Sequence, residues 1–236
     1  VTEHFGGMYE YDPLADKWTQ KADSGFHKRA TPMCALNGKI YTIGGYSNNN
    51  SFINVVQEYD PLNDKWTRKK DLPFVRAWSS VCIIGNKIYM FGGANGMGGS
   101  ADTMEYDPEK DEWTKKADMP EKGAFFPKSA PIIDGKVYVI GGYQAGVAIA
   151  DVQIYDPQKD EWTKGPDMPT ARYGSAVVAY KDKIFVFGGA TGADFAKNQL
   201  PTPKVEEYDV NGGNPPKSVS AEGKSATQWG SIKAKF

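Results

Sequence analysis

The side chains best suited to chemistry in this sequence are basic and aromatic, and they recur at one position relative to paired glycines. Arginine can hold a carboxylate through two parallel hydrogen bonds. Aromatic rings stack on flat ligands and, with arginine, dominate the energetics of protein interfaces. Sixteen residues before four Gly-Gly pairs stand Lys28, Arg76, Phe125 and Arg172, and close to them stand Arg29, Trp78, Phe126 and Tyr173. The pattern predicts a site that binds a ligand, either a sugar or a carboxylate-bearing group.

Residues that would support catalysis or metal binding form no comparable pattern. The two histidines, His4 and His27, lack metal-ligand spacing, and Cys34 and Cys82 have no histidine with which to build a zinc site. Both cysteines lie ten residues before a Gly-Gly pair, so we expect equivalent buried positions and free thiols. We therefore predict no metal, no cofactor and no catalytic residue. A non-enzymatic function is favoured over an enzymatic one.

The charge balance and the absence of long apolar runs exclude two classes of partner. The formal net charge is −1 and no basic arm is present, which argues against nucleic-acid binding. No apolar run approaches the ~18 residues of a membrane span. The chain begins at Val1, so we expect processing or truncation there. We expect a monomer, with a secreted or periplasmic location slightly favoured.

Three markers repeat along the chain with a common period, and this repetition determines the fold. Gly-Gly pairs are 48, 49 and 47 residues apart, and they begin at Gly44, Gly92, Gly141 and Gly188. Tyr-Asp pairs begin at Tyr11, Tyr59, Tyr106, Tyr155 and Tyr208. Seven residues after the first four of these tyrosines stand Trp18, Trp66, Trp113 and Trp162.

Each period has the composition of four short antiparallel strands. An apolar run is followed by a tight polar turn such as Asn37-Gly38, which is typical of β-hairpins. A second run ends in Gly-Gly, a variable loop leads to a third run ending in Tyr-Asp, and a fourth run carries the tryptophan. Such units cannot close a core alone, so they are expected to stack radially. The chain, residues 1–236, is predicted to be one all-β domain with almost no helix.

The concurrence of Ile-Tyr-x-Ile/Phe-Gly-Gly, Tyr-Asp-Pro and tryptophan at this spacing resembles the kelch repeat. The resemblance covers about residues 5–209, and it implies a β-propeller of four-stranded blades around a central channel. In such propellers arginines at the crossover between blades often brace neighbouring blades. Arg76 and Arg172 therefore have a structural interpretation beside the functional one, and the sequence leaves both open.

Five blades are predicted, with the last one shared by the two termini. Residues 8–20 supply a third and a fourth strand with no first or second strand before them, and residues 5–7 resemble a shortened second strand. Two β-compatible stretches near the C-terminus, around Ser218 and over 228–236, are expected to complete this blade. Alternatively, Trp229 is the displaced tryptophan of the last blade, and the chain is a fragment of a larger propeller.

Ligand binding is predicted on the face that carries the variable loops, because rigid scaffolds carry function on irregular loops. Loops between second and third strands share this face with the crossovers, and they span 46–54, 94–102, 143–151 and 190–204. They add Tyr46, Asn95 and Tyr143 to the candidate site. Trp78 is the strongest candidate, because the other repeats place Ala30, Pro127 and Gly174 at its position.

Three functions fit this face. The first is a binding module for a protein or peptide partner, which is the commonest use of kelch propellers. The second is a glycan-binding propeller that uses the rings of Trp78, Phe126 and Tyr173. The third is a sugar mutarotase that resembles bacterial kelch propellers acting on sialic-acid anomers. A fold does not select among these functions, so the first is favoured by analogy.

Overall fold

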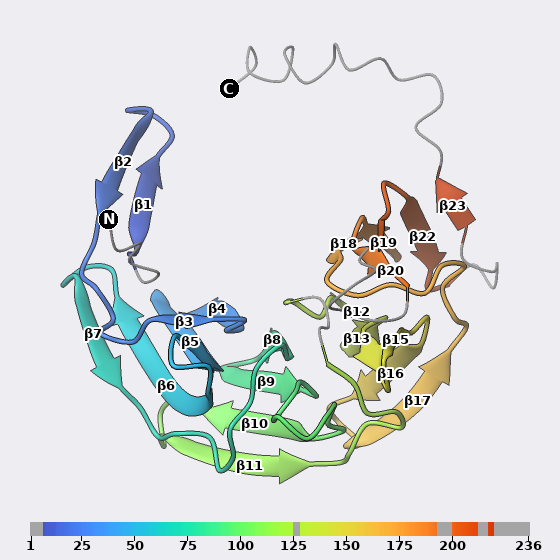
Figure 1. The fold of residues 1–236 in the computed structure, drawn as a ribbon, viewed down its shortest axis with the longest axis horizontal. Coiled ribbons are helices and arrows are strands. Elements are labelled where there is room, and N and C mark those ends of the chain that lie inside the picture. Colours follow the sequence, from blue (N-terminus) through green and yellow to red (C-terminus); the bar gives the residue numbers. More distant parts are fainter. Residues whose placement is uncertain (1–6, 125–127, 193–199, 212–216, 220–236) are drawn as a thin grey trace.

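The computed structural model describes residues 7–124, 128–192, 200–211 and 217–219, and these contain strands but no helix. Antiparallel sheets follow one another along an arc, with β1 and β2 at one end and the sheet of β18 to β23 at the other (Figure 1). The arrangement is that of a β-propeller, in which each four-stranded sheet is one blade. The predicted all-β fold is confirmed over the described residues.

We count the N-terminal hairpin as part of the first blade and number the following blades from the second to the fifth. The N-terminal hairpin and the second blade come first along the arc. The hairpin consists of β1 (Tyr9–Asp12) and β2 (Lys17–Gln20). The second blade has the sheet order β3-β5-β6-β7, with β4 also paired to β5. Its strands are β3 (Lys28–Arg29), β4 (Met33–Leu36), β5 (Lys39–Ser47), β6 (Phe52–Asp60) and β7 (Lys65–Arg68).

The third and fourth blades are regular antiparallel sheets of four strands. The third blade contains β8 (Ser80–Ile84), β9 (Lys87–Phe91), β10 (Thr103–Asp107) and β11 (Glu112–Lys116). The fourth contains β12 (Ile132–Ile133), β13 (Lys136–Ile140), β16 (Val152–Asp156) and β17 (Glu161–Gly165). Its variable loop forms a separate small hairpin of β14 (Tyr143–Gln144) and β15 (Val147–Ala148).

The fifth blade corrects one sequence-based expectation. Its strands are β18 (Ala176–Tyr180), β19 (Lys183–Phe187), β22 (Val205–Asp209) and β23 (Lys217–Val219), and its loop carries β20 (Ala190–Thr191) and β21 (Leu200–Pro201). The stretch around Ser218 was expected to complete the N-terminal blade, but it pairs with β22 as the fourth strand of the fifth blade.

Other parts of the predicted closure fall outside the described residues. These are Phe5 and Gly6 of the shortened strand, Trp229, and the stretch over 228–236. The number of blades in the closed ring therefore remains a prediction.

The hydrophobic core lies between the blades rather than within them. Three clusters of buried residues each join two successive blades, from the second to the fifth. In each cluster the Tyr-Asp tyrosine of one blade packs against the preceding blade, as Tyr106 packs against Tyr41 and Ile43. This face-to-face burial is what makes a row of repeats stable.

A repeated set of polar contacts, which we call the interblade clamp, explains the Tyr-Asp and tryptophan markers. In the third blade the carboxylate of Asp111 accepts hydrogen bonds from the Tyr106 hydroxyl and from the backbone N–H of Lys70 in the preceding blade. The indole of Trp113 donates to the carbonyl oxygen of Lys70 at 2.9 Å. The same contacts hold Ala22 with Tyr59, Asp64 and Trp66, and Ala117 with Tyr155, Asp160 and Trp162.

The paired glycines give the next crossover room to approach. Gly44 has a φ of +57°, and a Cβ there would lie 2.3 Å from the carbonyl oxygen of Arg76. The same carbonyl accepts a hydrogen bond from the N–H of Gly45 at 2.7 Å. A side chain at Gly44 would therefore separate the second blade from the third.

Candidate ligand-binding site at the channel mouth

A cavity of about 660 Å³ lies where the crossovers of the second to fifth blades converge. Most of the side chains that line it are small or apolar, and its volume lies within the range usual for ligand pockets. Each of these four blades contributes residues that lie at or just before its innermost strand. The lining residues used below are Pro32, Trp78, Ser79, Lys128, Tyr173 and Ser175, with Val177 and Val178.

Trp78 lies at this cavity in a backbone conformation that is costly for its residue type. Its φ is +56°, in the left-handed region. Ala30 and Gly174, at the equivalent positions of the second and fifth blades, have φ values of +55° and +63°. The repeat thus imposes this conformation, and a bulky residue pays more for it than alanine or glycine does. Such strain persists only where the surrounding structure enforces it, and it is commonest at functional sites.

An aromatic cluster holds the half-buried Trp78 indole on the loop side of the second blade. The ring centroid of Trp78 lies 5.6 Å from that of Tyr46 and 5.8 Å from that of Phe52. The guanidinium of Arg29, which is exposed, lies over the Tyr46 ring at 5.0 Å. Tyr46 therefore packs against Trp78, and Arg29 packs against Tyr46. Neither Arg29 nor Tyr46 is among the residues that line the cavity.

The other predicted arginines lie in the interior of the protein, away from the cavity. Arg76 has an exposed fraction of 2%, and its guanidinium pairs with Asp102 at 2.6 Å. Arg172 is completely buried, and its guanidinium pairs with Glu206 at 2.8 Å. Nη1 of Arg172 also donates to the carbonyl oxygens of Gly188 and Lys204. Both side chains are thus occupied within their own blades.

The backbone of each arginine is joined to the preceding blade. The carbonyl oxygen of Arg172 accepts from the N–H of Gly142, and its own N–H donates to the carbonyl of Ile149. Arg76 makes the corresponding bonds with Gly45 and Ile53. The backbone at these two positions therefore joins neighbouring blades, whereas the guanidinium groups stabilise the interior of their own blades.

The remaining predicted site residues are divided between the cavity and its surroundings. Tyr173 lines the cavity and packs its ring against Tyr143, with 5.1 Å between centroids. Asn95 uses its side-chain oxygen to accept the N–H of Met97 within its own loop. Lys28 does not line the cavity, and burial lowers its pKa to about 8. Phe125 and Phe126 lie outside the described residues.

Sequence reasoning missed Lys128 and Ser175, although the repeat contained the information. Thirteen residues before the Gly-Gly pairs stand Thr31, Ser79, Lys128 and Ser175. The hydroxyls of Thr31 and Ser79 donate to the carbonyl oxygens of Gly44 and Gly92. Lysine cannot fill that structural role in the same way. A position-by-position alignment of the repeats would have identified Lys128 as the exception.

The described residues offer no group of acidic, histidine and cysteine side chains that could hold a metal ion. Cys34 and Cys82 are not bridged, as expected. Burial raises the pKa of the Cys34 thiol to about 12 and also raises the pKa of Cys82. Neither thiol is therefore a nucleophile near neutral pH. The described part of the chain contains no helix that is long and apolar enough to cross a membrane.

The structure is a β-propeller with a cavity where the crossovers of its blades converge. The chain belongs to the kelch-repeat family, because residues 2–189 match the family model described as the KLHDC2/KLHL20/DRC7 Kelch-repeats domain. Compared with curated protein sequences, it has no significant match. Among solved structures it is similar to one titled "Structure of YjhT", with a TM-score of 0.75 and 17% identity, covering 86% of this chain and 76% of that one. At this identity the likeness shows the fold alone.

Proposed function

We propose that this protein binds a peptide segment of a partner protein in the cavity at the channel mouth, without catalysing a reaction. Kelch propellers serve in general as protein-interaction modules. The observation that carries the proposal is Trp78, an aromatic residue held in the left-handed conformation at the cavity where the repeat elsewhere uses Ala30 and Gly174. Tryptophan is the residue type most enriched among interface residues that dominate binding energy.

The lining of the cavity favours an apolar peptide side chain over a sugar. Pro32, Val177 and Val178 join Trp78, while the polar side chains are one lysine, one tyrosine and a few serines. The hydroxyl of Ser79 already donates to the carbonyl of Gly92. Sugar recognition normally requires several polar groups aimed at the ligand, and Arg76 and Arg172 are occupied in the interior.

The test is affinity selection from a random heptapeptide library, with a glycan array as the parallel arm. We expect selected peptides to bind the wild-type protein and to lose about tenfold in affinity with Trp78→Gly, which removes the ring but suits the backbone. Ala30→Gly changes the equivalent residue of the second blade and should leave affinity within about twofold. Saturable glycan binding without peptide enrichment would instead support the carbohydrate-binding alternative.

A further inference from the structure

The fourth and fifth blades meet without the interblade clamp that joins each earlier pair of blades. In the fourth blade, Asp160 and Trp162 hold Ala117 of the third blade at 2.9 and 3.0 Å. Glycine and proline stand at the corresponding sequence positions of the fifth blade, five and seven residues after Tyr208. The residue of the fourth blade that matches Ala117 is Pro166, which has no N–H to donate. The sequence therefore lacks both the side chains of the clamp and its backbone donor at this junction.

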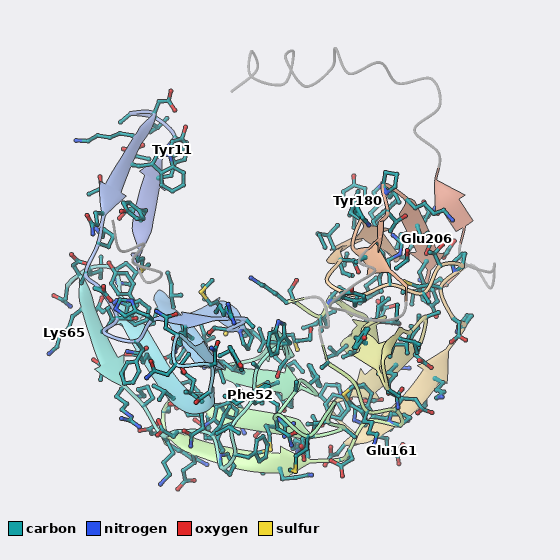
Figure 2. All side chains as sticks on the ribbon, in the orientation of Figure 1. Tyr11, Phe52, Lys65, Glu161, Tyr180 and Glu206 are labelled. Carbon is teal, nitrogen blue, oxygen red and sulfur yellow. The ribbon has the colours of Figure 1, made fainter. Side chains whose placement is uncertain are left out.

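In the part of the chain that the structure describes, only one face of the fifth blade is covered by another blade. Phe187 is 41% exposed, whereas Phe91, which precedes the Gly-Gly pair of the third blade in the same way, is completely buried. Phe91 packs against Tyr155 and Trp162 of the next blade, with 6.0 and 5.5 Å between ring centroids. Tyr180 on β18 is exposed as well, at one end of the arc (Figure 2). The fifth blade therefore has less apolar contact to lose on separation than the blades that are packed on both faces.

The contacts that hold the fifth blade to the fourth include an apolar interface and the crossover that leads into the fifth blade. The interface contains Ile140 of the fourth blade and Ile184 of the fifth. In the crossover, the carbonyl oxygen of Arg172 accepts from the N–H of Gly142 in the fourth blade. Its guanidinium pairs with Glu206 in the fifth. Water can solvate both charges when this pair separates, so the pair restrains the blade less than its burial suggests.

We propose that the fifth blade opens as a unit, in which β18, β19, β22 and β23 unfold together while the second to fourth blades stay folded. A blade that leaves its neighbour can no longer bury an apolar face, so separation and unfolding occur together. The fifth blade and its crossover form one wall of the cavity, where Tyr173, Ser175 and Val177 lie. Opening therefore exposes the cavity. It requires no ligand, so it goes beyond the proposed function.

Hydrogen exchange of the full chain, measured by mass spectrometry without a ligand, tests this opening. The equivalent strands β9 and β19 are each paired on both sides within their sheets. We expect protection factors at least about tenfold lower in β19 than in β9, with β18 and β22 matching β19, because a cooperative unit opens with one free energy. Protection factors that agree within about threefold between β9 and β19 would overturn the proposal.

Removal of an existing clamp distinguishes the effect of the clamp from that of a position at the end of the arc. Asp160→Ala leaves the fourth blade without its clamp, so exchange in β13 and β16 should rise about tenfold while β9 stays within about threefold. Asp156→Ala is the matched control. Asp156 lies in the same turn and accepts from the N–H groups of Gln158 and Lys159, and its loss should leave β13 and β16 within about threefold. Unchanged exchange in Asp160→Ala would reject the role of the clamp.

Glu206→Gln tests the crossover contact. It keeps the size of the side chain but removes the charge that pairs with Arg172, so exchange of β19 should rise about tenfold further while β9 and β13 stay within about threefold. Glu207→Gln is the control, because the ion pair of Glu207 with Lys183 lies within the fifth blade and is partly exposed. It should leave exchange of β19 within about threefold. An equal rise in all blades of Glu206→Gln would show that the fifth blade unfolds only with the whole chain, and would overturn the proposal.

Discussion

At the outer rim, equivalent residues of successive blades make the same contacts, whereas at the channel mouth they do not. In each case an aspartate accepts one hydrogen bond from a tyrosine hydroxyl of its own blade and one from a backbone N–H of the preceding blade. These aspartates are Asp64, Asp111 and Asp160. At the mouth, by contrast, Trp78 replaces small residues and Lys128 replaces hydroxyl residues of the other repeats. Repetition therefore marks contacts that assemble the blades, and we propose that departures from it at the cavity mark residues that bind a ligand.

The fifth blade shows how a departure in the interior can also be structural. Its sequence does not contain the side chains of the interblade clamp, because Gly213 and Pro215 stand five and seven residues after Tyr208 instead of aspartate and tryptophan. The matching residue of the fourth blade is Pro166, which has no N–H to donate. This blade instead contains the buried Arg172–Glu206 ion pair, with Glu206 on β22 (Figure 2).

The largest effect on stability is expected from that buried pair. Glu206→Ala leaves the guanidinium of Arg172 buried without its counter-charge, and such changes cost about 3–5 kcal/mol. Glu207→Ala removes the neighbouring residue, whose half-exposed ion pair with Lys183 should contribute less than about 1 kcal/mol. Urea denaturation measures both costs. Equal values for the two variants would contradict the structural role assigned to the Arg172–Glu206 pair.

A smaller effect is expected from the interblade clamp, and it should differ between two equivalent blades. Asp111→Ala removes the acceptor of two hydrogen bonds, at 2.6 Å from Tyr106 and 2.7 Å from Lys70, and should cost about 1–3 kcal/mol. Asp16 is its counterpart in the N-terminal hairpin. Among the described residues, Asp16 accepts a hydrogen bond from Tyr11 alone, and that tyrosine is 42% exposed.

Asp16→Ala should therefore cost less than about 1 kcal/mol in the same urea experiment. A cost as large as that of Asp111→Ala would show that the N-terminal clamp holds a neighbouring segment. Tyr11 lies at one end of the arc and Tyr180, also exposed, at the other (Figure 2). The comparison thus also tests the predicted closure of the ring.

Acid should destabilise the fold by protonating carboxylates that accept hydrogen bonds in the folded state. Burial opposes ionisation of Asp111, but hydrogen bonds from Tyr106 and Lys70 outweigh it and hold its pKa below the ordinary value of 3.8. The bond from Lys39 is the main cause that lowers the pKa of Asp60 to about 2. Groups with depressed pKa values stabilise the fold above their unfolded pKa, and this contribution disappears as the pH falls through the folded pKa.

Unfolding free energy measured between pH 5 and about pH 2 should therefore fall, with most of the loss below about pH 4. Asp111→Ala should show a shallower fall than wild type, because one of the depressed carboxylates is gone. Stability that rises on acidification over this range would contradict the sign of these pKa changes.

Most of the fold followed from periodicity, while the site followed from it only in part. Strand order, the Tyr-Asp turns and the position of Trp78 are set by local chemistry that repeats, so the sequence predicts them. The burial of Arg76 and Arg172 depends on partners 26 and 34 residues away, Asp102 and Glu206, which spacing alone does not pair. The role of Ser218 depended on which strand edge was free, which is a property of the assembled sheet.

A modest change in stability is expected from Trp78→Gly, although its effect on binding should be large. Glycine relieves a left-handed conformation that costs an ordinary residue roughly 1–2 kcal/mol. Against this, the variant loses ring contacts with Tyr46 and Phe52, each about 0.5–1.5 kcal/mol, together with some buried apolar area. The two contributions nearly cancel, so unfolding free energy should change by less than about 2 kcal/mol. A loss of about 3–5 kcal/mol, typical of a core tryptophan, would place Trp78 in the core and remove the main support for a ligand site at the cavity.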